Sequence, residues 1–215
     1  MESNRQIELL ENYAIDENGV IYQVGYSELT YDFAYVELRY NHNAPVSQMA
    51  HLRLGYLLAS IGHTPSSLLD VGYGNGEFLR TAKTLIDDCN GYDIPPAYPL
   101  PSSITQQDSL YSREFEVVTF FDSLEHFRTP YEISQLRCRY VMISVPWCHY
   151  VDREWFSEWK HRRPDEHLWH FGSDSLVRFF ASIGFRLLRS GNPEDAIRGS
   201  LNGLPNILTA VFERA

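Results

Sequence analysis

The residue types best suited to ligand chemistry lie in a glycine-rich segment that follows a short apolar run. The run is Ser67–Val71, with Asp70 near its end, and the alternating glycines Gly72, Gly74 and Gly76 come directly after it. Glycine permits positive φ angles and lets a ligand approach the backbone closely. A helical pattern begins after the last glycine, and a helix N-terminus presents unpaired N–H groups. The segment therefore predicts a strand, a tight ligand-binding turn and the start of a helix.

The spacing of these glycines separates two kinds of nucleotide ligand. Dinucleotide-binding turns have the pattern G-x-G-x-x-G, with the pyrophosphate at the helix N-terminus. Here the pattern is G-x-G-x-G, and Glu77 occupies the place of the third dinucleotide glycine. Carboxylates at Asp70 and Glu77 would repel a pyrophosphate, whereas they suit a ligand with a sulfonium, an ammonium and no phosphate. S-adenosylmethionine is such a ligand.

Further candidate residues follow the ends of later predicted strands, where ligands bind in open α/β sheets. Asp93 lies 21 residues after Gly72, close to the spacing at which a carboxylate binds the ribose hydroxyls. The alternative for Asp93 is a turn aspartate ahead of a proline-rich loop. Glu125 and His126 follow another apolar run, and His126 suits a general base because its pKa lies near neutrality. The alternatives are a helix cap for Glu125 and local packing for His126.

The segment Asp70–Gly76 resembles the first motif of the class I S-adenosylmethionine-dependent methyltransferases, although Tyr73 stands where that motif usually has a small residue or cysteine. The resemblance covers about residues 46–215. It implies a Rossmann-like, doubly wound α/β fold: a mostly parallel seven-stranded sheet with one antiparallel strand and helices on both faces. It implies that Asp108 accepts a hydrogen bond from the adenine amino group, with a solvated loop or helix cap as the alternative. The cofactor-binding residues expected in this way are Asp70, Gly72, Gly74, Gly76, Asp93, Asp108 and Asp122.

The triplet Leu124-Glu125-His126 resembles the motif that follows the fourth strand in this family. The resemblance places Glu125 and His126 beside the transferred methyl group as the candidate catalytic residues. His167 and His170 compete with His126 for the role of base, and His170 also resembles a pocket or structural histidine of the family.

A metal-dependent alternative stays open. Asp122-x-x-Glu125-His126 resembles the E-x-x-E-H ligand set of metal-assisted O-methyltransferases that act on small RNAs or in the ubiquinone pathway. A downstream ligand would be His167 or His170. A divalent ion there would anchor a diol or catechol and lower the pKa of its hydroxyl group. Asp122 is shorter than the glutamate of that set, and metal-free relatives also have Glu-His, so the sequence leaves the metal undecided.

Composition restricts the protein class. The chain has 215 residues, 44% hydrophobic and 21% charged, which is typical of one soluble domain with a small appendage. No apolar stretch approaches the roughly 18 residues of a membrane span, and three scattered cysteines favour a reducing cytoplasm. The net charge of −10 opposes double-stranded DNA as a partner. The Asn/Asp-Pro-Pro-Tyr/Phe motif of DNA amino-methyltransferases does not follow Phe121.

Two regions are expected. Residues 1–45 form a hairpin around Asn18-Gly19 and a Tyr-rich cap, and residues 46–215 form the methyltransferase domain. Apolar periodicity and turn residues predict helices over 46–61, 77–86, 131–138 and from Ser173 or Asp174 to Ile183. Strands are expected at 67–71, 103–105, 115–121, 140–145, 185–190 and 207–213, with a further short strand that ends at residues 91–94. No helix is expected between the last two strands, which suggests one antiparallel edge. Residues 146–172 read as a long irregular segment.

The sequence therefore predicts transfer of a methyl group from S-adenosylmethionine to an oxygen, nitrogen or carbon atom of a small-molecule acceptor. Two alternatives remain: a metal-assisted RNA or catechol-type O-methyltransferase, and a non-catalytic Rossmann-like binding module. The oligomeric state and the identity of the acceptor are left open.

Overall fold

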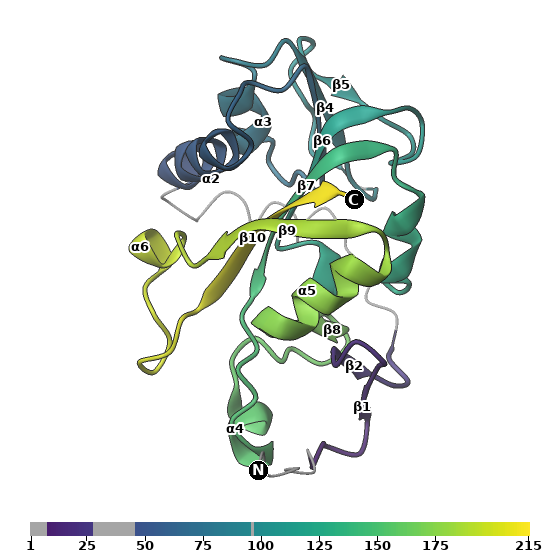
Figure 1. The fold of residues 1–215 in the computed structure, drawn as a ribbon, viewed down its shortest axis with the longest axis vertical. Coiled ribbons are helices and arrows are strands. Elements are labelled where there is room, and N and C mark those ends of the chain that lie inside the picture. The colour runs from purple at the N-terminus through teal and green to yellow at the C-terminus, as the bar shows by residue number, and fades with distance from the viewer. Residues whose placement is uncertain (1–7, 28–45, 96) are drawn as a thin grey trace.

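A seven-stranded sheet forms the centre of the protein (Figure 1). The computed structural model describes residues 8–27, 46–95 and 97–215. The strand order is β5-β4-β3-β6-β7-β10-β9. The strands are β3 (Ser67–Val71), β4 (Asp88–Tyr92), β5 (Thr105–Gln106), β6 (Phe115–Phe121), β7 (Cys138–Pro146), β9 (Phe185–Gly191) and β10 (Ile207–Arg214).

Only β10 runs against the other strands of this sheet. The pairs β3–β4, β3–β6, β4–β5 and β6–β7 are parallel, while β10 is antiparallel to both β7 and β9. The predicted fold class is confirmed, but the reversed strand lies inside the sheet, not at its edge. Burial explains the order: residues 207–212 are all buried, whereas most of β9 is exposed or half-buried. A strand buried on both faces belongs in the middle of a sheet.

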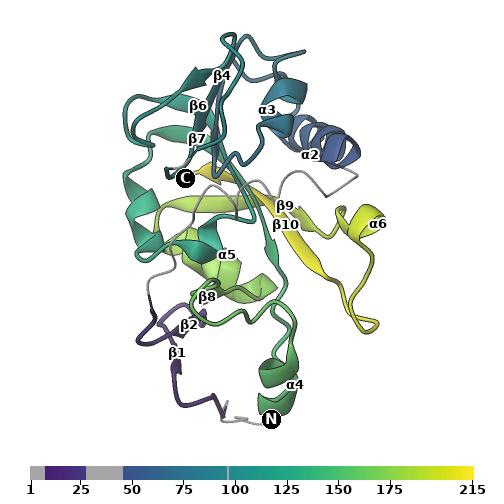
Figure 2. The same ribbon diagram turned by 180° about the vertical axis from the view of Figure 1, so that it is seen from behind.

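Helices cover both faces of the sheet (Figures 1 and 2). α2 (Val46–Ile61) and α3 (Glu77–Ala82) pack together on one face, and α5 (Ser173–Ser182) lies on the other. The side chains of successive residues in a strand point to opposite faces of the sheet. Met142 packs in the core beneath α2 and α3, while Val141 packs in the core beneath α5.

Several local predictions are corrected by the structure. The helix expected over 131–138 is a 3-10 helix, η2 (Pro130–Gln135), because the backbone is already extended at Leu136 and β7 begins at Cys138. The helix expected to reach residue 86 ends at Ala82. The N-cap of α5 is Gly172, whose N–H donates to Ser175 Oγ (2.9 Å).

The segment 146–172 is not structureless. It contains α4 (Arg153–Glu158), whose N-cap Asp152 accepts a hydrogen bond from the Trp155 N–H, and the short strand β8 (Trp169–His170). The expected hairpin is present as β1 (Tyr13–Ile15) and β2 (Ile21–Gln23), and β2 also pairs with β8. The hairpin thus shares a three-stranded sheet with the later part of the chain.

The Tyr-rich stretch Tyr31–Tyr40 lies outside the described residues. Among the residues that are described, none of the helices has the length and apolar character needed to cross a bilayer.

Candidate functional site

The glycine turn connects β3 to α3 and has the backbone conformation that its sequence predicts. Gly72, Gly74 and Gly76 have φ angles of +76°, +58° and +75°, in the left-handed region that L side chains rarely adopt. At Gly72 a second constraint applies, because an added Cβ would lie 2.7 Å from the Ser123 Cβ. The turn therefore needs glycine both for its own conformation and for its contact with the segment after β6.

Tyr73, the unusual residue of the turn, is a core residue. Its ring is buried beside Phe78 and Leu79, and its hydroxyl donates to the Tyr98 carbonyl oxygen (2.7 Å). Gly91 on β4 makes room for this ring, since a Cβ there would lie 2.7 Å from Tyr73 Cδ1. The departure from the family motif is compensated by a small residue on the neighbouring strand.

Asp93 connects the end of β4 to the glycine turn. Its Oδ2 accepts the Gly74 N–H and its Oδ1 accepts the Ile94 N–H, each at 2.9 Å. A carboxylate has about four acceptor positions, so these two bonds leave capacity for the two hydroxyl groups of a ribose. Burial raises the pKa of Asp93, while the bonds from Gly74 and Ile94 lower it.

Asp70 lies beneath the turn, with only 2% of the residue exposed. The Thr119 hydroxyl donates to Asp70 Oδ1 (2.7 Å) from the adjacent strand β6. Burial raises the pKa of Asp70 to about 7, against the opposing effects of the Thr119 bond and of Arg53. Asp108, in contrast, is exposed and lies two residues after β5.

Asp122 follows β6 with a left-handed φ of +51°, and its carboxylate lies between two guanidinium groups. Arg53 of α2 contacts Asp122 Oδ2 at 3.1 Å, and Arg198 at the end of α6 (Asp195–Arg198) contacts the same oxygen. These cations hold the pKa of Asp122 well below its usual range.

Glu194 completes this group of charges. It is fully buried, with 0% of the residue exposed. Its carboxylate accepts from Arg53 Nε at 2.7 Å and pairs with Arg198 Nε at 3.0 Å. We call Arg53, Asp122, Glu194 and Arg198 the ion-pair network. The sequence analysis missed three of its four members, because ordinary charged residues in separate segments carry no motif.

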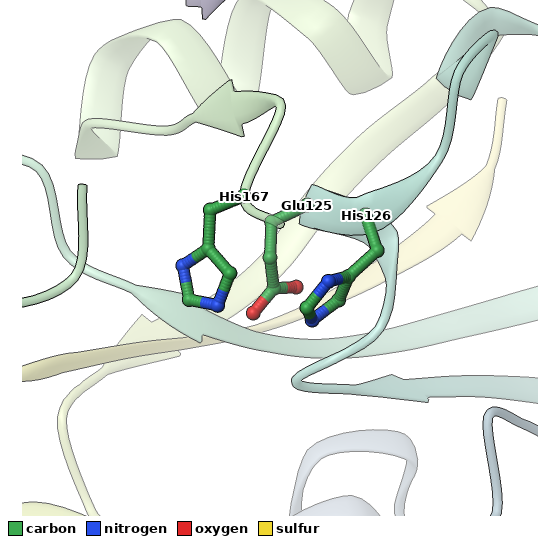
Figure 3. A group of neighbouring side chains, drawn as sticks. All are labelled: Glu125, His126 and His167. Atoms are coloured by element: carbon green, nitrogen blue, oxygen red, sulfur yellow. The ribbon is translucent and has the colours of Figure 1, made fainter. Parts of the chain in front are cut away.

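A cluster of three potential ligands follows the turn at Asp122, and Figure 3 shows its three side chains. Glu125 and His126 come from the 3-10 helix η1 (Leu124–His126), and His167 comes from the segment before β8. One donor atom from each lies within 4.8 Å of the others. The Leu168 N–H donates to the Glu125 carbonyl oxygen (2.8 Å), which brings the two segments together. We call Glu125, His126 and His167 the acceptor-side cluster.

Two other predicted ligands lie outside this cluster. The carboxylate of Asp122 faces the two arginines of the ion-pair network. His170, three residues after His167, is buried among aromatic rings, with centroids 5.2 Å from Phe156 and 5.6 Å from Trp159. Among the described residues the candidate ligand group therefore contains His167 and neither Asp122 nor His170.

Backbone carbonyl groups set the tautomers of the two clustered histidines. His126 Nδ1 lies 2.8 Å from the Glu166 carbonyl oxygen, and His167 Nδ1 lies 2.8 Å from the His161 carbonyl oxygen. A carbonyl oxygen only accepts, so each Nδ1 carries the hydrogen and each Nε2 the lone pair of the neutral ring. Burial and the neighbouring His126 lower the pKa of His167 to about 3, so that ring stays neutral near pH 7. The cluster can accept a proton or bind a cation.

We expect the buried Asp70 carboxyl to make stability depend on pH. Its pKa is raised from 3.8 to about 7, so the folded chain holds this proton more tightly than the unfolded chain does. The contribution of Asp70 to the free energy of unfolding therefore falls as the pH rises through this window. In urea titrations, Asp70→Asn should gain stability relative to the wild type between about pH 4 and about pH 7.

The variant Thr119→Val provides a check of opposite sign. The Thr119 bond lowers the pKa of Asp70, so its loss should become more destabilising as the pH rises. A stability difference between Asp70→Asn and the wild type that stayed constant across this range would contradict the assignment of a raised pKa to Asp70.

Comparison with solved structures shows which proteins share this fold. Burkholderia thailandensis 1,6-didemethyltoxoflavin-N1-methyltransferase, with bound S-adenosylhomocysteine, is 12% identical with a TM-score of 0.59, over 95% of this chain and 99% of that one. The plantazolicin methyltransferase BpumL is 15% identical with a TM-score of 0.58, over 84% and 90% of the two chains. Magnesium protoporphyrin IX methyltransferase from Synechocystis PCC 6803 is 16% identical with a TM-score of 0.53, over 88% and 91%.

Sequence comparison defines the family. A direct comparison with curated proteins gives no significant match. Residues 40–190, well over half of the chain, match the family described as a methyltransferase domain. The chain therefore belongs to the methyltransferase domain family, as an S-adenosylmethionine-dependent methyltransferase of class I.

Proposed function

We propose that this enzyme transfers the methyl group of S-adenosylmethionine to an oxygen, nitrogen or carbon atom of a small-molecule acceptor. The observation that carries the proposal is the bond between the Gly74 N–H and the Asp93 carboxylate (2.9 Å). This bond joins the left-handed turn after β3 to the end of β4, so that a backbone cradle and a ribose-binding carboxylate share one edge of the sheet.

On the cofactor side, the proposal assigns the backbone of Gly72, Gly74 and Gly76 to close contact with the cofactor and Asp93 to its ribose. The buried Asp70 supplies negative charge beneath the turn for the ammonium and sulfonium groups. Asp108, exposed after β5, is assigned to the adenine amino group. The Asp122 carboxylate is already paired with two arginines. Its proposed role toward the cofactor is therefore indirect: it holds the turn after β6 in place.

On the acceptor side, the proposal assigns the polar work to Glu125 and His126. In the reaction, a lone pair of the acceptor atom attacks the methyl carbon, the carbon–sulfur bond breaks, and its electrons remain on the sulfur. Alignment of these three atoms supplies most of the rate enhancement. Where the acceptor atom carries a hydrogen, His126 Nε2 takes the proton, because Nδ1 is already a donor to the Glu166 carbonyl oxygen. The Glu125 carboxylate, 1% exposed, stabilises the resulting imidazolium.

Two observations support a small acceptor over a nucleic acid duplex. The net charge of −10 opposes a polyanion. Three of the structural neighbours are methyltransferases named for 1,6-didemethyltoxoflavin, magnesium protoporphyrin IX and plantazolicin.

We expect Asp93→Ala to weaken binding of S-adenosylhomocysteine, because the ribose loses a charged acceptor for its hydroxyl groups. Hydrogen bonds to a charged group contribute about 1.5–3 kcal/mol, which corresponds to a loss of at least about tenfold in affinity. Isothermal titration calorimetry of the full chain measures it. Asp88→Ala, at the opposite end of β4 and half-exposed, is the matched control and should bind normally.

Two results would contradict this account of the cofactor side. One is equal affinity of Asp93→Ala and the wild type for S-adenosylhomocysteine. The other is binding of NAD in preference to S-adenosylmethionine. Absence of binding by the wild type would instead favour a non-catalytic binding module.

The geometry of the acceptor-side cluster favours a second candidate function, metal-assisted O-methylation of an RNA or catechol-type acceptor. One nitrogen from each of two imidazoles and one carboxylate oxygen, all within 4.8 Å of one another, form a donor set suited to a divalent transition metal. Each histidine donates Nδ1–H to a backbone carbonyl, the arrangement that commonly orients metal-binding imidazoles. A bound ion would lower the pKa of an acceptor hydroxyl.

We expect the wild type to bind Co²⁺, a probe with visible absorption bands, and His167→Gln to lose at least about tenfold in affinity. His63→Gln is the matched control, because His63 is an exposed histidine paired with Glu116 at the far end of the strands. Each variant is first shown to bind S-adenosylhomocysteine, so that loss of the fold is detected separately. Equal Co²⁺ affinity of His167→Gln, Glu125→Gln and the wild type would rule out this metal site.

A further inference from the structure

We propose that Asn206 is a positioning residue for the acceptor-side cluster, acting through His161 on His167. This inference rests on the proposed function of that cluster. It concerns the connection between β9 and β10, residues 192–206, which no motif in the sequence marks.

Every polar group of Asn206 makes a hydrogen bond. Its N–H donates to Asp195 Oδ2 (2.8 Å), its carbonyl oxygen accepts the Trp147 N–H (2.9 Å), and its Nδ2 donates to the Gly199 carbonyl oxygen (3.1 Å). The residue is 3% exposed. A buried asparagine with all of its groups engaged has one orientation, and here the Gly199 carbonyl oxygen orients the side-chain amide.

The orientation of Asn206 determines the tautomer of His161. Because Nδ2 points to the Gly199 carbonyl oxygen, Oδ1 faces His161 Nε2, at 2.8 Å. An amide oxygen only accepts, so His161 carries its hydrogen on Nε2 and its lone pair on Nδ1. The side chain of His161 is thereby tied to the start of β10.

His161 passes this constraint to the cluster. Its carbonyl oxygen accepts the Nδ1–H of His167 (2.8 Å), the bond that leaves the lone pair of His167 on Nε2. His167 is 4% exposed and its ring centroid lies 4.8 Å from that of His126. The path from Asn206 to the cluster therefore consists of two hydrogen bonds and one residue between them.

The same connection also reaches the other side of the cluster. Arg198 of α6 contacts Asp122, three residues before Glu125, and Asp195 of α6 anchors the Asn206 and Ile207 N–H groups. Figures 1 and 2 show α6 on the side of the molecule away from β1 and β2. One short segment between the last two strands thus fixes the loop that carries Glu125 and His126 and the loop that carries His167.

The test compares Asn206→Ala with Asn192→Ala in the full chain. Asn192 is the matched control, because it is exposed, lies at the other end of the connection and donates to the same Asp195 oxygen (3.0 Å). Long-range ¹H–¹⁵N NMR of the imidazole rings reports the tautomers directly. We expect the wild type and Asn192→Ala to show hydrogen on Nε2 of His161 and on Nδ1 of His167. In Asn206→Ala both signatures should become mixtures, and affinity for Co²⁺ should fall about tenfold.

Affinity for S-adenosylhomocysteine should stay within about twofold of the wild type in Asn206→Ala, since the cofactor side is not part of this path. An unchanged His167 signature in Asn206→Ala would overturn the proposal. The NMR result stands whether or not the wild type binds Co²⁺, so failure of the metal function and failure of the positioning role are distinguishable.

A second pair of variants keeps the proposal testable if Asn206→Ala does not fold. His161→Gln retains an amide that can donate to Asn206 Oδ1, so the wild-type signature of His167 should persist. His161→Leu lacks such a donor and should lose that signature. Identical His167 signals in these two variants would overturn the proposal in the same way.

Discussion

Four paired charges, of which Glu194 is fully buried, join three distant parts of the chain at the end of β6. Arg53 comes from α2, Asp122 from the turn after β6, and Glu194 and Arg198 from the segment around α6. Burying a charge is costly, and removal of an arginine that pairs with Glu194 would leave that buried carboxylate partly uncompensated. The network balances two cations against two anions. Asp122 has a left-handed φ, which is uncommon for residues other than glycine and which aspartate tolerates better than most.

This network positions the turn between β6 and η1, and therefore the side that we assign to the acceptor relative to the side that we assign to the cofactor. Asp122 redirects the chain from β6 into η1, so that Glu125 and His126 follow it directly. Ser123, in the same turn, lies so close to Gly72 that a side chain at position 72 would clash with it. The glycine turn and the acceptor-side cluster are therefore built against each other, because β3 and β6 are neighbouring parallel strands. Under the proposed function, carboxylates on one side of the site would bind the cationic cofactor, and imidazoles on the other side would accept a proton from the acceptor.

Local patterns in the sequence predict the sheet and the glycine turn. Apolar runs give the strands, and the alternating glycines give a left-handed turn that only glycine adopts easily. Asp93 is predictable for the same reason, because its distance from the turn is set by one helix and one strand. The 3-10 helix at 130–135 is harder to predict, because its length and composition resemble those of a short α-helix.

Long-range pairings explain what the sequence does not predict. Arg53 and Glu194 are 141 positions apart and meet only in the folded chain. The choice between His167 and His170 depends on the local geometry around β8, which places His167 beside His126 and buries His170 among aromatic rings. Asn206 and His161 carry no motif, and their proposed roles depend on one hydrogen bond between residues 45 positions apart and on two bonds within separate loops. The residues to which we assign orientation of the site are thus less predictable than those to which we assign contact with the cofactor.

An experimental structure of this protein with bound S-adenosylhomocysteine is the most direct test of the central claim. We expect the ribose hydroxyl groups on the Asp93 carboxylate, the amino-acid end of the ligand over the turn at Gly72–Gly76, and the sulfur atom facing Glu125 and His126. A ribose that did not contact Asp93, or a sulfur atom directed away from η1, would contradict the assignment of the two sides of the site.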